Sequence, residues 1–233
     1  MVWGPALHLL TVGTILAIGV VLGVVGRRLA PRAGRRVERG LGLLGLAAAA
    51  AAYAWSVSVG GSGPGAWLRL HPCNLLAALA PLALLTHARW AARLVYFAGL
   101  SMTPQALFTP LVRVGPENPH FWEFWVLHGQ VIWSAAWLLA VRRFRPTWRD
   151  WRLACIVGLG YGAVIFGLNL LLDTNFAYLN DVLPGQPTLL DHLGPWPYRV
   201  VVMMLIGLAV FTLLMLPFVR RVRRPIRSAG PMD

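Results

Sequence analysis

Lysine is absent from this sequence, and charged residues of any kind are scarce. Only 12% of the 233 residues are charged, about half of the share that is typical of a soluble domain. Eight residues are acidic and two are cysteines. The cysteines, Cys73 and Cys155, do not form a Cys-x-x-Cys pair and are too few for a disulfide framework, which excludes a disulfide-stapled scaffold.

The sequence is rich instead in apolar residues, which make up 58% of it and give a mean hydropathy of +0.63. They fall in runs of 17 to 22 residues, and an α-helix of about 20 residues crosses the hydrocarbon core of a bilayer. Such runs exclude a soluble globular enzyme, a disordered chain and the strands of a membrane barrel. They predict an all-α protein that forms a polytopic membrane helical bundle.

Seven runs are long enough to cross a membrane. We predict transmembrane helices over Ala6–Gly26, Leu41–Gly60, Leu70–Thr86, Trp90–Phe108, Phe121–Val141, Trp151–Leu172 and Tyr198–Phe218. They form a single transmembrane domain over residues 1–219, and an arginine-rich tail follows over residues 220–233. The first run has neither a basic segment before it nor a small-residue cleavage site, so we expect a retained helix rather than a signal peptide.

The net charge of +13 suggests nucleic-acid binding, but the positions of the arginines exclude it. Eighteen of the 21 arginines lie after the first, third, fifth and seventh predicted helices, and only Arg69, Arg113 and Arg199 lie at the other ends. Basic residues collect on the cytoplasmic side of membrane proteins. The N-terminus is therefore predicted outside and the C-terminus in the cytoplasm, where the arginines would meet anionic lipid headgroups.

Polar residues within the predicted spans collect in the outer half of the bilayer. The residues are His71, Cys73, Asn74, Ser101, Thr103, Gln105, Glu123, His128, Gln130, Asn169 and Asp173. Polar residues inside a membrane are costly and mark candidate functional sites. A channel or transporter would carry them through the midplane as well, so this distribution favours a pocket that opens toward the outer leaflet. Asn169 and Asp173 are four residues apart and are expected to share a helical face.

Cys73 and His128 lie at similar predicted depths, and together they could form a nucleophile and its base. The alternative for Cys73 is a small buried apolar side chain. The alternative for His128 is a hydrogen bond to a neighbouring helix. His71 precedes Pro72, which suits the first turn of a helix, and it could equally be an interfacial, solvated histidine. Cys155 lies in an apolar stretch and is expected to be structural.

Four elements resemble the YwaF-like bacterial integral membrane proteins. They are His71-Pro72-Cys73-Asn74, His128, Asn175-Phe176-Ala177-Tyr178-Leu179 and Leu189-Leu190-Asp191-His192-Leu193-Gly194-Pro195-Trp196-Pro197. The family pattern has H-x-C-D, N-Y-x-Y-L and L-L-D-x-L-G-P-W-P, so the resemblance extends over nearly the whole chain. One position departs from it, because Asn74 stands where the family has an acidic residue.

The resemblance implies a function. That family is similar to a eukaryotic transmembrane acyltransferase that remodels ether phospholipids with a cysteine and a histidine, and more distantly to androgen-induced-type hydrolases of fatty-acid esters. It implies that Cys73 is the nucleophile and His128 its partner, in an acyltransferase or acyl hydrolase of the bacterial cytoplasmic membrane. The expected substrate is a phospholipid or lysophospholipid, and no cofactor is expected.

Further residues are expected to bind the substrate or orient the catalytic histidine. They are His71, Asn74, Gln105, Asn169, Asp173, Asn175 and Tyr178. The outer segment over residues 173–197 would act as a lid. Two other functions stay open at this point. His71, Cys73, His128 and His192 could hold a metal ion or haem, or the pocket could belong to a carrier or scaffold without chemistry.

Overall fold

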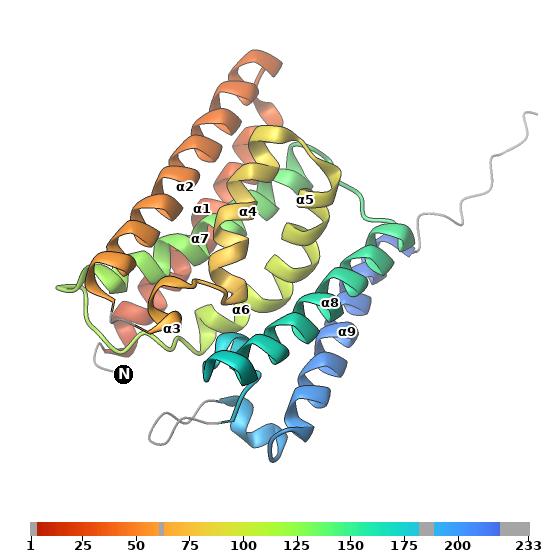
Figure 1. Ribbon diagram of the computed structural model, residues 1–233. Helices are drawn as coiled ribbons and strands as arrows, with labels where there is room; N and C mark the ends of the chain where they lie inside the picture. Colours follow the sequence, from red (N-terminus) through yellow and green to blue (C-terminus); the bar gives the residue numbers. More distant parts are fainter. Residues whose placement is uncertain (1–3, 61–62, 182–188, 220–233) are drawn as a thin grey trace, which may run out of the picture.

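The computed structural model describes residues 4–60, 63–181 and 189–219, and all regular structure within these ranges is helical (Figure 1). The elements are α1 (Pro5–Arg28), α2 (Pro31–Val59), α3 (Pro64–Trp67), α4 (Pro72–Thr86), α5 (Arg89–Leu94), the π-helical η1 (Val95–Gly99), α6 (Leu100–Phe108), α7 (Pro119–Ala140), α8 (Trp148–Leu172), the short η2 (Phe176–Tyr178) and η3 (Leu189–Leu193), and α9 (Tyr198–Val219). We call the end of the bundle where α2 ends and α4 begins the outer end.

A helix or a continuous helical run lies at each of the seven predicted spans. The fourth is α5, η1 and α6 in succession, with the π-helical segment in the middle. Four helices are long and apolar enough to cross a membrane by themselves, namely α1, α2, α8 and α9, and α4 is a shorter apolar helix. The all-helical membrane architecture is therefore confirmed, whereas the count of seven spans and the orientation stay predictions.

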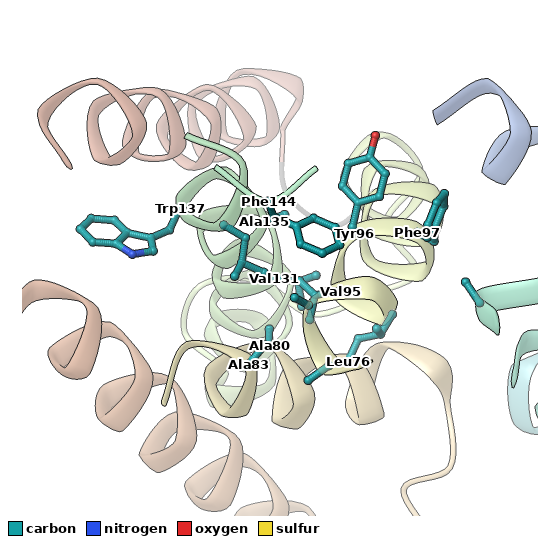
Figure 2. Close-up of a cluster of buried hydrophobic side chains, with 14 of the residues drawn as sticks. Leu76, Ala80, Ala83, Val95, Tyr96, Phe97, Val131, Ala135, Trp137 and Phe144 are labelled. Atoms are coloured by element: carbon teal, nitrogen blue, oxygen red, sulfur yellow. The ribbon is translucent and has the colours of Figure 1, made fainter. Parts of the chain in front are cut away.

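The interior of the bundle is formed by α4, η1 and α7. Figure 2 shows side chains from these three elements converging, among them Leu76 and Ala80, Val95, and Val131 and Ala135, all at most 5% exposed. Large exposed apolar side chains lie mainly on α1, α2, α8 and α9, as expected of surfaces that face lipid. Because α7 packs against protein, it tolerates polar residues that a lipid-facing helix excludes, which explains why hydropathy alone does not identify it.

The second helix begins about ten residues earlier than predicted. Pro31 occupies its first turn, where the missing N–H of proline costs nothing. The arginine-rich segment before Leu41 is therefore helical rather than a solvated loop. Glu38, 4% exposed, accepts a 2.5 Å hydrogen bond from Nε of Arg142. An apolar run predicts only the membrane-buried part of a helix, so this polar extension was missed.

The C-terminal helices α8 and α9 lie side by side along one edge of the bundle (Figure 1). Two contacts join α9 to the interior: the Tyr96 hydroxyl donates to the Leu214 carbonyl at 2.6 Å, and the Phe97 ring lies 5.5 Å from that of Phe211. At the first turn of α8, Asp150 accepts hydrogen bonds from Arg89 and Arg93. These two arginines are thus ion-paired within the protein, whereas the sequence predicts that the inner arginines meet lipid headgroups.

Candidate functional site

Cys73 is the second residue of α4, at the outer end of the bundle. Pro72 is the first helical residue and His71 is the N-cap, as the His-Pro sequence predicts. The thiol is half-buried. The first turn of a helix presents unpaired N–H groups and the positive end of the helix dipole. Cys73 therefore lies where backbone groups favour a negatively charged atom.

The segment after α8 is folded back by one buried amide. Oδ1 of Asn169 accepts hydrogen bonds from the Phe176 N–H at 2.8 Å and the Thr174 hydroxyl at 3.0 Å. Its Nδ2 donates to the Phe176 carbonyl at 2.9 Å, and the residue is 0% exposed. The amide is thus occupied by the loop, which favours a loop-anchoring role over the headgroup or histidine contacts expected from the sequence.

The expectation that Asp173 continues the helical face of Asn169 is wrong. The helix ends at Leu172, and Asp173 adopts the left-handed conformation with φ of 49°. A left-handed residue terminates many helices, and aspartate tolerates this conformation better than most residues. The side chain of Asp173 is exposed. The spacing rule failed because it assumed that the helical backbone continues through Asp173, one residue beyond the end of α8.

The folded-back loop contacts His71. The Ala177 N–H donates to Nδ1 of His71 at 3.4 Å, so a neutral His71 carries its proton on Nε2. The His71 ring lies 5.7 Å from that of Phe176 and 5.5 Å from that of Tyr178. The chain thus brings two segments about a hundred residues apart together beside Cys73.

Ala177 and Tyr178 both have left-handed backbones, with φ of 56° and 59°. This conformation is strained for residues with a side chain, and such strain is common where surrounding structure holds a functional loop. Burial raises the pKa of Tyr178, and the charge of a Cys73 thiolate raises it further. Tyr178 therefore stays a neutral phenol that can donate a hydrogen bond.

The rest of the loop is fixed by its own polar groups and by the start of α9. Oδ1 of Asn175 accepts from the Asn180 N–H at 2.9 Å, and its Nδ2 donates to the Asp181 carbonyl at 3.1 Å. Nη2 of Arg199 donates to the Asn180 carbonyl at 2.6 Å. Trp196 Nε1 donates to the Leu179 carbonyl at 3.2 Å. Three of the sequence elements that carry the resemblance therefore meet at the outer end.

His128 is buried on α7, 7% exposed. Its Nδ1 lies 2.6 Å from the Phe124 carbonyl and therefore carries the proton in the neutral ring. Among the described residues, no hydrogen bond or ring contact joins His128 to Cys73. Leu76 and Val131, three residues after Cys73 and His128 respectively, belong to the same core cluster (Figure 2), whereas the Phe124 ring, 4.2 Å from that of His128, packs against a second cluster.

The register of α4 and α7 places Cys73 and His128 at similar depths. Nη2 of Arg69, just before α4, donates to Oε1 of Glu123 at 2.6 Å, and Nε2 of Gln130 donates to the Ala77 carbonyl at 2.7 Å. The two helices therefore run in the same direction with a constant offset. That offset sets Cys73 at the level of the helical turn that contains His128.

An ion-pair network at the same end was missed from the sequence. Besides Arg69, Glu123 is bonded to Nδ1 of His120 at 2.9 Å and to the Ser56 hydroxyl at 3.4 Å. Oδ1 of Asn74 accepts a 3.4 Å hydrogen bond from Arg69. The sequence did carry a signal for this network: Arg69 and Glu123 have opposite charges and lie at the outer ends of two predicted spans. Such residues can pair where the helices pack.

The remaining candidates lie apart from this cluster. Gln105 is exposed on α6, and its backbone carbonyl accepts from Thr109. His192 is exposed on η3, and Cys155 is buried in the apolar core. Within the part of the chain that the structure describes, no three His, Cys, Asp or Glu side chains gather closely enough to hold a metal ion. The tail, residues 220–233, lies outside the described residues.

The model of the TMEM164 family matches residues 3–215. The chain belongs to the TMEM164 family. No curated protein and no solved structure matches it.

Membership of the TMEM164 family, a transmembrane family, identifies the chain as a multi-pass membrane protein. The match contains every candidate site residue, from His71 on α4 to Tyr178 in the outer loop. The candidate site of this TMEM164-family chain therefore lies within the matched region.

Proposed function

We propose that this TMEM164-family chain is a membrane-embedded acyltransferase or acyl hydrolase that acts on a phospholipid or lysophospholipid. Cys73 is the nucleophile and His128 is the general base. In this proposal the chain is related to the YwaF-like proteins and to the eukaryotic phospholipid acyltransferase. It lies in the bacterial cytoplasmic membrane, with the site toward the outer leaflet.

The observation that supports the proposal is the similar depth of the two residues on packed helices. Leu76 and Val131 pack in one core, and Cys73 and His128 lie one helical turn farther toward the outer end on the same helices. A base must come within hydrogen-bond reach of its nucleophile, but such contacts are often longer before the substrate binds. A side-chain rotation of either residue is the movement that the proposal requires.

The proton positions suit this chemistry. Because Nδ1 of His128 is held by the Phe124 carbonyl, Nε2 is the nitrogen that takes the thiol proton. The Cys73 sulfur then forms a bond to the ester carbonyl carbon, the alcohol leaves with the proton from Nε2, and a thioester remains. A lysolipid hydroxyl, or water, attacks the thioester and gives its proton to His128, and the proton returns to the thiolate as the sulfur leaves.

The surroundings of Cys73 supply the other roles. The Asn74 and Leu75 N–H groups donate to the His71 carbonyl, so the backbone N–H of Cys73, together with the helix dipole, would stabilise the oxyanion formed at the carbonyl oxygen. His71 and Tyr178 lie over this turn and would contact the substrate near its ester. Asn74 stands where the YwaF-like pattern has an acidic residue. Its side-chain oxygen accepts a hydrogen bond from Arg69, so Asn74 would orient that guanidinium rather than a histidine.

The test is the reaction of the purified chain with a lipid-like thiol-directed electrophile, followed by intact mass in wild type, His128→Gln and Cys155→Ala. We expect one rapid label on Cys73, a loss of rate of about 100-fold or more in His128→Gln, and no change in Cys155→Ala. Slow labelling that is indifferent to His128 would overturn the dyad. His120→Gln is the matched control, since it removes an exposed histidine of the same helix.

A further inference from the structure

The second helix contains six consecutive alanines, Ala47–Ala52, whose small side chains leave space beside α4. A cavity of about 520 Å³ lies there between α2, α3 and α4, within the size range of small-molecule sites. Its lining is almost wholly apolar and consists of Leu46, Ala49, Ala50, Ala52, Tyr53, Trp67, Leu68, Arg69, Asn74, Leu75, Ala77, Ala78 and Leu127. We call this space the α2–α4 groove.

The charged group of the groove lies near its outer end, where Arg69 and Asn74 contribute to the lining, and Tyr53 adds a hydroxyl. Both described hydrogen bonds of the guanidinium come from Nη2. Its Nε and Nη1 therefore have no partner among the described residues, and the side chain is 25% exposed. Guanidinium N–H groups of this kind bind phosphate oxygens well.

A second hollow on the other side of α2 provides a contrast. It measures about 430 Å³ and lies between α2 and α7, with Ala48, Ala51 and Trp55 in its lining. The ionisable residue in its lining is Glu123, the ion-pair partner of Arg69. Arg69 lines the α2–α4 groove and not the second hollow, so a phosphate-bearing amphiphile meets a guanidinium only in the groove.

We propose that the α2–α4 groove binds one acyl chain of a phosphate-bearing lipid, with the phosphate at Arg69. The inference rests on the proposed function for the identity of this lipid as the acyl-transfer substrate. Asn74 and Leu75 line the groove and directly follow Cys73 in α4. Cys73 itself does not line the groove, so in this proposal the ester of a lipid whose phosphate lies at Arg69 reaches the thiol across the first turn of α4, while its chain runs along the alanines.

The groove predicts a matched set of variants on one helix. Ala50→Leu and Ala49→Leu fill it, whereas Ala47→Leu and Ala54→Leu add the same bulk at exposed positions that line neither hollow. The probe is a phosphatidylcholine with a diazirine near the end of one chain, at low mole fraction in nanodiscs that contain the full chain. Crosslinked peptides are quantified by mass spectrometry.

We expect crosslinks to concentrate on residues 46–53 and 75–78 and to fall at least fivefold in Ala50→Leu, with no change in Ala54→Leu. Crosslinks spread over α1, α8 and α9, and indifferent to Ala50→Leu, would overturn the groove. If Ala50→Leu does not fold, Ala49→Leu tests the same point. Arg69→Gln lowers crosslinking of this probe but leaves that of a diazirine diacylglycerol, which has no phosphate, unchanged. Equal loss of both would refute the phosphate contact.

The same measurement in Cys73→Ser separates the two proposals. If the groove is crosslinked but Cys73→Ser keeps its turnover of phospholipid, the acyl-transfer function fails and the groove stands as a lipid-binding site. If Cys73→Ser abolishes turnover while crosslinks lie elsewhere, the function stands and the groove fails.

Discussion

At the scale of single residues, Asn169 controls the shape of the loop above Cys73. Its amide makes three hydrogen bonds, to the Phe176 backbone and the Thr174 side chain. We predict that Asn169→Leu leaves these buried groups without partners and destabilises the chain by about 2 kcal/mol. Hydrogen exchange of residues 174–179 should accelerate, and acyl transfer should fall as the loop loses its place over His71.

The control for this prediction is Asp173→Asn, four residues along the chain. Asp173 is exposed and left-handed, and asparagine adopts that conformation readily. We expect wild-type stability and exchange in Asp173→Asn. Equal exchange rates in Asn169→Leu and wild type would show that other contacts hold the loop.

The sequence pattern identified Asn169 as a candidate site residue but did not reveal its role. An asparagine in an apolar span must find partners, and this requirement is visible in the sequence. Its partners, however, lie in a loop that begins only after α8 has ended at Leu172, and helical spacing cannot anticipate such a turn. The same holds for His71, whose contact with Ala177 spans 106 residues.

At the scale of elements, the inner end of α2 is held by Glu38, which pairs with Arg142 and lies 3.6 Å from Nε2 of His87. The Glu38 side chain is 5% exposed and its partner Arg142 is 33% exposed. We predict that Arg142→Ala leaves Glu38 buried without its main partner and lowers the free energy of unfolding by about 2 kcal/mol, between the values for surface and fully buried pairs. Thermal unfolding in detergent measures this change.

The exposed Arg149 on α8 provides the comparison, since Arg149→Ala removes the same charge without breaking a described ion pair. The double variant Glu38→Gln with Arg142→Ala should recover part of the loss, because the buried charge is removed as well. A double variant less stable than Arg142→Ala would contradict this account of the pair.

Helix positions were predictable wherever apolar runs coincide with helices, as at α1 and α9, because membrane burial requires both. The inner part of α2 was not predictable in this way, since its arginines resemble a loop and only the pairing of Glu38 with a distant arginine shows its packing. The break at η1 was also invisible, because its π-helical residues are as apolar as their neighbours.

At the scale of the whole molecule, the arrangement of lipid-facing and interior helices depends on the chain crossing the membrane in the predicted direction. Exposed apolar side chains cover α1, α2, α8 and α9, while α4 and α7 lie inside with the candidate site at the outer end. Since the arginines predict a cytoplasmic C-terminus, Cys73 should be reached from the outer leaflet.

This orientation is tested with single cysteines in the Cys73→Ala, Cys155→Ala background. We predict that Ser58→Cys, exposed near the outer end of α2, reacts with a membrane-impermeant maleimide in intact cells. Ser228→Cys, in the arginine-rich tail, should react only after the membrane is permeabilised. The reverse pattern would put the candidate site at the cytoplasmic leaflet, and acyl transfer would then have to draw its lipid from that side. Labelling of both positions in intact cells would instead mean an even number of crossings, because α2's outer end and the tail would share one side.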